Sequence, residues 1–208
     1  FVRSENGGQS WSAPQVIFQA NRDDELARWR RIAVDASGRL HVALTHTMSD
    51  AVQAEGRTAP NFLYYLRSDD RGATWTEPYL VTPEPDFGEI NVATSGSDAV
   101  HLVWNGRAGR HGRYHRWSED GGQTWSNPVE VTAPWSIDSM RTSGLTGFPA
   151  LATDATDMLH MVSSMGGGDY YLSWKNGVWS QPLLISRGLD GRGVTGEGAV
   201  TTSLEQPS

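Results

Sequence analysis

The hydrophobic and polar positions of this chain form short segments that recur three times along the sequence. Each round holds three such segments, separated by glycine, aspartate or serine, in which apolar and polar side chains tend to alternate. Alternation of this kind predicts half-buried β-strands joined by tight turns. The first strands are predicted at Ile32–Asp35, Asn91–Thr94 and Pro149–Asp154, the second at Gly38–Ala43, Asp98–Val103 and Asp157–Val162, and the third at Phe62–Leu66, Arg113–Arg116 and Asp169–Leu172.

A repeated segment of eight residues, here called the turn unit, follows the predicted third strands and also opens the chain. Two copies, Ser68–Trp75 and Ser118–Trp125, agree closely. A looser copy stands at Ser4–Trp11, and a shortened one runs from Ser173 to Trp179. A proline follows each tryptophan at the same distance, at Pro14, Pro78, Pro128 and Pro182. Matched copies predict a repeated supersecondary unit, with a fourth strand after each turn unit.

The residue types of the turn unit have a physical interpretation. Its Asn or Asp accepts hydrogen bonds from backbone amides two residues on, and its glycine supplies a positive φ. Its tryptophan buries a large ring, and the proline, which lacks an amide donor, places the next strand at a sheet edge. The residues with these structural roles are Ser4, Asn6, Gly8, Trp11, Ser68, Asp70, Gly72, Trp75, Ser118, Asp120, Gly122, Trp125, Asn176, Gly177 and Trp179.

With these turn units the chain resembles the Asp-box (bacterial neuraminidase repeat) proteins, whose best-known members are sialidases with six-bladed β-propellers. The resemblance covers essentially the whole chain. It implies an all-β fold of four-stranded antiparallel blades, with about three complete blades plus partial ones. Residues 1–208 then form one propeller segment, divided into a partial blade (1–20), three blades (28–82, 88–132 and 148–186) and a tail or start of a further blade (187–208). We expect further blades from missing sequence or from a second copy.

Composition narrows the classes of function. The net charge is −7 and there is no basic cluster, which disfavours nucleic acid and anionic membrane surfaces as partners. No apolar run approaches the roughly 20 residues of a membrane span, and the absence of cysteine excludes disulfides and thiolate metal sites. No signal peptide is visible, and the start at Phe1 suggests a mature, trimmed or excised piece. The resemblance implies a secreted or cell-surface protein without a cofactor.

The resemblance also implies that a ligand binds at one end of the propeller axis. The loops between blades line this end, at Gln19–Ala27, Pro83–Glu89, Ala133–Gly147 and Arg187–Glu197. The loops between second and third strands join them, at His46–Asn61, Gly106–Gly112 and Ser164–Gly168. Sialidases place there an arginine triad that grips the substrate carboxylate, a tyrosine nucleophile activated by a glutamate, and an aspartate as acid and base.

Candidate residues follow from that chemistry. Asp23 and Asp24 are the acid/base candidates. Arg28 stands where the family has the arginine of a Phe-Arg-Ile-Pro signature, but the other three signature residues are absent. The alternative for Arg28 is a surface position on a helical turn over Asp23–Arg31. The other candidates for substrate binding are Arg107, Arg110, His111, Arg141 and Tyr170. For Tyr170 the alternative is packing within a blade, because Tyr64, Tyr65 and Tyr114 occupy matching strand positions.

His41, His101 and His160 recur at the same point of successive repeats. Equivalent positions of different blades are separated radially, so we favour three hydrogen-bonded structural histidines over a metal site. Three functions stay open: an exo-sialidase, another propeller glycosidase or polysaccharide lyase, and a non-catalytic module that binds a glycan or a protein. The incomplete signature counts against the first. We expect a carbohydrate-active protein, part of a glycoside hydrolase, whose 208 residues are inactive alone.

Overall fold

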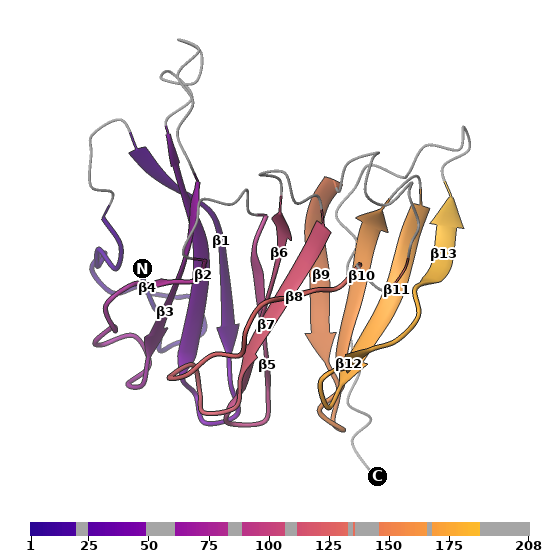
Figure 1. Cartoon of the computed structure of the whole chain (residues 1–208). Coiled ribbons are helices and arrows are strands. Elements are labelled where there is room, and N and C mark those ends of the chain that lie inside the picture. Colours follow the sequence, from indigo (N-terminus) through magenta and orange to yellow (C-terminus); the bar gives the residue numbers. More distant parts are fainter. Residues whose placement is uncertain are drawn as a thin grey trace.

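In the computed structural model the described part of the chain comprises residues 1–19, 25–48, 61–82, 89–106, 112–132, 135, 146–165 and 168–187. These residues form three antiparallel sheets that stand side by side, and they include no helix (Figure 1). No helix that could cross a membrane is therefore found among them. The prediction of an all-β chain with four-stranded antiparallel sheets is confirmed.

Each sheet follows the predicted order of strands. The first holds β1 (Glu25–Val34), β2 (Leu40–Met48), β3 (Phe62–Ser68) and β4 (Tyr79–Leu80), and the second holds β5 (Asn91–Ser95), β6 (Ala99–Gly106), β7 (Gly112–Ser118) and β8 (Val129–Glu130). The third holds β9 (Thr146–Thr153), β10 (Leu159–Met165) and β11 (Gly168–Lys175), and its outer edge is split into β12 (Val178–Trp179) and β13 (Leu183–Arg187), both paired with β11.

The first strands of the three sheets lie next to one another, β1 against β5 and β5 against β9. Threonine hydroxyls tie them together: Thr94 Oγ1 donates to the Val34 carbonyl at 3.1 Å, and Thr153 Oγ1 donates to the Thr94 carbonyl at 2.6 Å. Apolar side chains fill the spaces between the sheets. One cluster around Leu63 and Leu102 joins the first and second sheets, and another around Val103 and Met161 joins the second and third.

The stretch predicted as an alternative helical turn, Asp23–Arg31, is part of a strand where it is described, with a bulge between Arg28 and Arg31. β1 begins at Glu25, and its residues pair with β2, for example Ala27 with His46. Ladder hydrogen bonds to a neighbouring strand satisfy most of the strand backbone, whereas ion pairs on a single helical turn add only a few tenths of a kcal/mol. The loop predicted to reach Ala27 therefore ends earlier, and Arg28 lies within a strand.

The turn units form compact turns built on side-chain hydrogen bonds. The Ser68 hydroxyl accepts from the Gly72 amide at 2.7 Å and donates to Asp70 Oδ1 at 2.8 Å. The same Oδ1 accepts from the Thr74 amide at 2.8 Å, so the amide bound is four residues on and not two as predicted. The hydrogen bonds from Thr74 lower the pKa of Asp70 to about 2. Equivalent bonds occur at Ser118–Asp120 and Ser4–Asn6.

The glycine of each full turn unit has the predicted positive φ, which is 87° at Gly8, 89° at Gly72 and 87° at Gly122. The fourth unit differs. Trp174 stands opposite Leu159 as Ser68 stands opposite Leu40, so the alignment that matched Ser173 with Ser68 is wrong by one residue. The fourth turn is instead a tight two-residue hairpin over Asn176 and Gly177, both with positive φ, as type I′ turns require.

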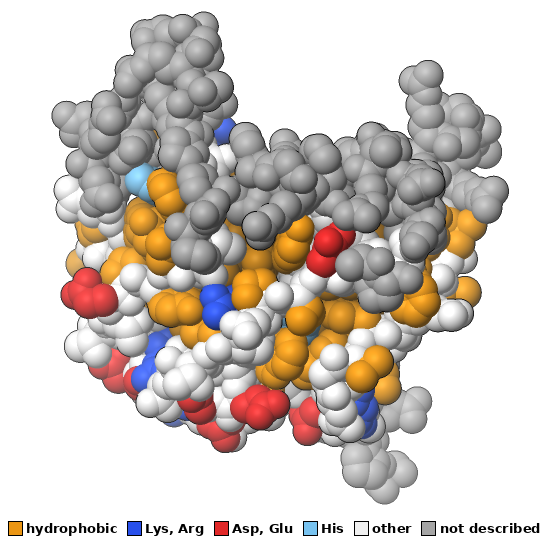
Figure 2. Space-filling model, viewed as in Figure 1, with side chains coloured by type: hydrophobic (Ala, Val, Ile, Leu, Met, Phe, Trp, Pro, Cys, Tyr) orange, Lys and Arg blue, Asp and Glu red, His pale blue; other side chains and the backbone are white. Residues whose placement is uncertain are grey.

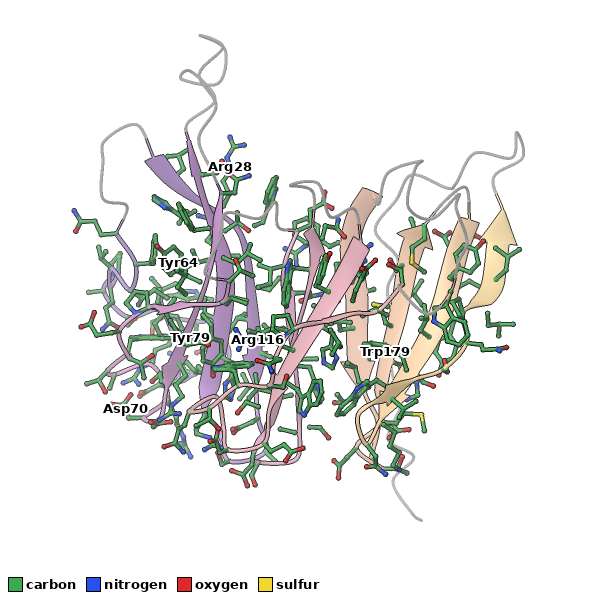
Figure 3. The ribbon with its side chains drawn as sticks, in the orientation of Figure 1. Arg28, Tyr64, Asp70, Tyr79, Arg116 and Trp179 are labelled. Atoms are coloured by element: carbon green, nitrogen blue, oxygen red, sulfur yellow. The ribbon has the colours of Figure 1, made fainter. Side chains whose placement is uncertain are left out.

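The tryptophan of a turn unit packs against the preceding part of the chain. Its ring meets the side chain that stands three residues before the preceding turn unit: Trp75 meets Phe1 at 5.1 Å between ring centroids, and Trp125 meets Tyr65 at 4.8 Å. Trp179 meets His115 at 5.2 Å in the same way (Figure 3 labels Trp179). We call this recurring pair the aromatic contact. Trp11 breaks the pattern, because this residue is 62% exposed and the predicted burial is wrong for this copy.

Candidate functional site

The first and third strands of each sheet begin, and the second strands end, at one end of the sheets, drawn uppermost in Figure 1. Arg28 lies at this end, on β1 (Figure 3). The predicted residues Asp23, Asp24, Arg107, Arg110, His111 and Arg141 lie outside the described residues. Arg28 and Tyr170 are therefore the predicted ligand-binding residues that the structure places.

β1 carries a bulge where it reaches this end. Its pairing with β2 shifts between Arg28 and Arg31, and Trp29 has a φ of 48°. The left-handed region is unusual for a bulky residue, and bulges commonly re-aim a side chain next to a functional site. Here the indole of Trp29 is turned towards Phe148 of β9, with ring centroids 6.3 Å apart and an interplanar angle of 78°.

The same phenylalanine carries a cation. Arg31 Cζ lies 3.8 Å from the centre of the Phe148 ring, a close cation–π distance. β1 and β9 are the first strands of the first and third sheets, with β5 between them, so side chains from two separated strands meet over one end of the middle strand. Asn91, the first residue of β5, ties that end to β9 through a 2.8 Å hydrogen bond to the Pro149 carbonyl.

Trp29, Glu89 and Phe148 are equivalent in the repeat. Each stands six residues before the end of the first strand of its sheet, where the chain turns into the second strand. The residues at these turns are Asp35, Ser95 and Asp154. All three therefore belong to the same end of the first strands. We refer to Arg28, Trp29, Arg31, Glu89 and Phe148 as the axial cluster. Contacts join Trp29 and Arg31 to Phe148, and Arg28 and Glu89 lie at the same end of the strands, so this end presents two arginines, two aromatic rings and one carboxylate.

Neighbouring side chains hold the carboxylate of Glu89 in place. Asn105 Nδ2 donates a hydrogen bond to Glu89 Oε2. Beyond them Arg113, fully buried between the second and third sheets, donates from Nη2 to Ser163 Oγ at 2.5 Å. Burial lowers the pKa of Arg113 to about 9, and the negative charge of Glu89 acts in the opposite direction. A buried cation needs such a counter-charge, which gives Glu89 a defined position at the axial end.

Tyr170 lies on β11 and packs against the cluster that contains Val103 and Met161. The matching residue Tyr114 stacks on Trp104 with centroids 5.8 Å apart. Tyr64 similarly packs against Phe18 at 5.1 Å. The structure thus gives Tyr170 a packing role, and its contact with a ligand stays a prediction.

The three histidines have the hydrogen bonds expected of a structural role. His41 bridges Tyr65 Oη at 2.7 Å and Asp35 Oδ2 at 3.2 Å, and His160 bridges Tyr171 and Asp154 likewise. His101 instead contacts His115, with Nδ1 and Nε2 3.2 Å apart. Burial lowers the pKa of His101 to about 4, and burial together with the neighbouring His101 lowers the pKa of His115 well below its usual value. Among the described residues no group of His, Asp and Glu could hold a metal ion.

Two surface hollows, of about 630 and 570 Å³, lie elsewhere. They are lined mainly by residues of the N-terminal segment and the first sheet, including Phe1 and Arg71 in one and Phe18 and Tyr64 in the other. Neither includes a member of the axial cluster. No local pattern points to Arg31, Glu89 or Phe148 as site residues, because their grouping depends on the positions of three strands.

No protein-family model and no curated protein matches the chain. Solved structures do. A Hadza microbial sialidase is 19% identical with a TM-score of 0.59, and the match covers 90% of this chain and 39% of that one. A leech intramolecular trans-sialidase is 12% identical with a TM-score of 0.60, over 88% and 45% of the two chains. The catalytic domain of a Coprinopsis cinerea α-L-arabinofuranosidase is 14% identical with a TM-score of 0.53, over 82% and 54%.

The chain thus spans less than two thirds of these similar structures. Sequence identities this low show a similarity of fold alone, and the sialidases among the matches indicate a sialidase-like fold. With its side-by-side antiparallel sheets, the chain has a sialidase-like propeller fold.

Proposed function

We propose that the chain is part of a carbohydrate-active propeller and that its axial cluster binds an acidic sugar. One observation carries the proposal: Arg31 lies 3.8 Å above the ring of Phe148, whose ring also meets Trp29. Guanidinium groups bind carboxylates in a planar, charge-assisted way. Aromatic rings offer an apolar surface to the C–H face of a sugar. An acidic sugar needs both kinds of contact at once.

The other members of the cluster complete this site. Arg28 supplies a second cation at the same end. Glu89, held by Asn105, can accept hydrogen bonds from sugar hydroxyl groups. We extend the site to Arg107, Arg110, His111 and Arg141 as further cations, and we keep Asp23 and Asp24 as acid/base candidates. Asp-box membership, the blade boundaries, six-bladed closure and a secreted or cell-surface location belong to the same proposal.

The similar structures support a carbohydrate ligand without deciding which one. They include sialidases, a family 117 glycoside hydrolase and an arabinofuranosidase. A sialidase mechanism requires a tyrosine nucleophile, whereas the rings of the axial cluster belong to Trp29 and Phe148, which carry no hydroxyl. We therefore propose that the 208 residues alone bind an acidic glycan without turning it over, and that the whole protein is a glycoside hydrolase.

Calorimetric titration with 3′-sialyllactose, trigalacturonate and lactose tests the binding. We expect at least one acidic sugar to bind more tightly than neutral lactose, and added salt to weaken the binding because exposed charges are screened. Arg28→Ala and Trp29→Ala should each weaken it at least tenfold. Lys175→Ala, which removes an exposed charge bonded to the Thr156 carbonyl near a turn between strands, is the matched control and should leave it unchanged.

The competing outcomes are distinct. Equal binding of lactose and the acidic sugars, or binding indifferent to both Arg28→Ala and Trp29→Ala, would contradict an acidic-sugar site at the axial cluster. Release of the fluorophore from a fluorogenic sialoside, lost in Arg28→Ala, would show that the chain is catalytic by itself and overturn the prediction of binding without turnover.

A further inference from the structure

The second sheet differs from the other two around the histidine that recurs in each sheet. In the first sheet His41 bridges the hydroxyl group of Tyr65 at 2.7 Å and the carboxylate of Asp35 at 3.2 Å. The third sheet repeats this arrangement around His160. A carboxylate at hydrogen-bond distance favours the charged form of an imidazole, so each of these histidines lies beside a group that balances a bound proton. His101 is the equivalent histidine of the second sheet.

Both partners are replaced around His101. His115 stands where the first sheet has its tyrosine, and Ser95 stands where it has its aspartate. The Ser95 hydroxyl donates to Asp157 Oδ1 at 2.5 Å, so it is engaged by the turn between β9 and β10. Two imidazoles therefore face each other, with His101 Nδ1 and His115 Nε2 3.2 Å apart. One proton lies between these nitrogens when the pair is neutral, and charging both rings would place a proton on each and break the hydrogen bond.

The pair is buried at the joint between the second and third sheets. His101 and His115 are 1% and 0% exposed. Trp174 and Trp179 of the third sheet and Trp117 of β7 lie against them, with ring centroids 5.0 to 5.3 Å apart. Apolar side chains also dominate the surface around the position that Figure 3 labels Trp179 (Figure 2). The two imidazoles thus form part of the apolar contact that holds the two sheets together.

No carboxylate among the described residues balances a charge on this pair. Burial lowers the pKa of His101 to about 4, and burial together with the charge of His101 lowers the pKa of His115 well below its usual value. A proton bound by the closed pair would therefore stay uncompensated. The other ionisable side chains of the strands around the pair have contacts elsewhere: Arg113 with Ser163, Arg116 with the Val81 carbonyl, His160 with Tyr171, Asp169 with Ser164, Lys175 with the Thr156 carbonyl, Tyr114 with Trp104, and Tyr170 with the cluster around Met161.

We propose that acid opens the joint between the second and third sheets and that the pair of His101 and His115 is the group that responds. In the closed joint both rings stay neutral and pack among the tryptophans. In the open joint water solvates them, and each binds a proton at the ordinary pKa of about 6.5. Opening therefore takes up two protons as the pH falls below about 6.5, whereas the closed joint is favoured above it. Burial also lowers the pKa of His41, but Asp35 acts in the opposite direction, so the joint between the first and second sheets should stay closed.

Hydrogen exchange detected by mass spectrometry tests this opening strand by strand. Protection factors are measured between about pH 7 and pH 4.5, each against the exchange rate of the unfolded chain at the same pH. Between about pH 5.5 and 4.5 the protection of β10 and β11 should fall by about 100-fold, because opening binds about two protons. β2 and β3 of the first sheet should keep their protection. In His101→Gln and in His115→Gln, where one of the two protons is lost, the fall should be only about tenfold.

His41→Gln and His160→Gln change the same position of the other two sheets and are the matched controls, in which the fall should equal that of the parent. Circular dichroism at about pH 7 reports whether each variant is folded. Where a glutamine variant of the pair is not folded, His115→Tyr copies the residue type of the first sheet and should also reduce the fall to about tenfold. Constant protection of β10 and β11 down to about pH 4.5, an equal loss in all three sheets, or an unchanged fall in the folded variants of the pair would overturn the proposal.

Discussion

Trp125 packs at the joint between the first and second sheets. Its ring meets Tyr65 edge-on, stacks on Tyr79 with centroids 6.0 Å apart, and lies 5.9 Å from the guanidinium carbon of Arg116. Arg116 also donates to the Val81 carbonyl of the first sheet, at 2.5 Å (Figure 3 labels Tyr79 and Arg116). Trp125→Ala removes the centre of this arrangement and leaves a cavity between two sheets.

The size of the effect follows from burial and packing. A ring of this kind buries about 150 Å², which at about 25 cal/mol per Å² contributes about 4 kcal/mol. The aromatic pair with Tyr65 adds about 1 kcal/mol. The buried indole N–H of Trp125 has no acceptor among the described residues, and relief of that penalty returns about 1–2 kcal/mol. We expect Trp125→Ala to lower the free energy of unfolding by about 3 kcal/mol, at the low end of the range for truncated buried aromatics because Trp125 is half-buried.

Urea denaturation followed by circular dichroism measures this free energy. Trp75→Ala should behave similarly, because Trp75 makes the same contact with Phe1. Trp11→Ala is the matched control because Trp11 is exposed, and it should change the stability by less than about 0.5 kcal/mol. The reasoning is refuted if Trp125→Ala unfolds at the same urea concentration as the parent, or if Trp11→Ala costs as much as Trp125→Ala.

Two further predictions concern backbone conformation and pH. Gly122→Ala should destabilise the chain more than Gly8→Ala. Both substitutions place a Cβ at a positive φ, but only the Cβ at Gly122 would collide with a side chain, that of Tyr65. Equal melting temperatures would contradict this. Since burial lowers the pKa of His101 to about 4, the unfolded chain binds more protons between pH 6.5 and 4. The contribution of His101 should be fully present above pH 6.5 and fall by about 3 kcal/mol as the pH drops to 4. Urea titrations at intervals of half a pH unit check this. In His101→Gln, which gains no proton, the free energy of unfolding should fall less steeply with decreasing pH. An unchanged pH dependence would assign it to other groups.

Local sequence signals were sufficient for the strands and turns. The alternation predicted the strands, and the turn unit predicted positive φ at Gly72 and Gly122 because its bonds are made within eight residues. The one-residue error at Ser173 has a simple cause: the fourth hairpin is shorter, and Trp174 takes the place of the serine. The exposure of Trp11 could not be predicted either, because a tryptophan is buried by what lies against it and not by its own turn unit.

The candidate site was predictable only in part. Arg28 is a candidate because it matches a family position, and its contact with a ligand stays a prediction. The bulge beside it, where Trp29 lies against Phe148, has no signal in the sequence. Glu89 carries no local pattern, being one acidic residue at the end of a loop. Its significance comes from Asn105 and the buried Arg113, which reach it from neighbouring strands. Such groupings arise from the arrangement of the sheets, which no single segment encodes.

The most direct measurement of the central claim is a nitrogen–proton correlation spectrum of the indole groups during titration with 3′-sialyllactose or trigalacturonate. The chain has nine tryptophans, and Trp29→Phe identifies the signal of Trp29 by its disappearance. An acidic sugar bound at the axial cluster should shift the Trp29 signal with increasing concentration, while the signals of Trp11 and Trp125 stay in place. A Trp29 signal that does not move at saturating sugar, or shifts confined to tryptophans outside the axial cluster, would contradict the claim.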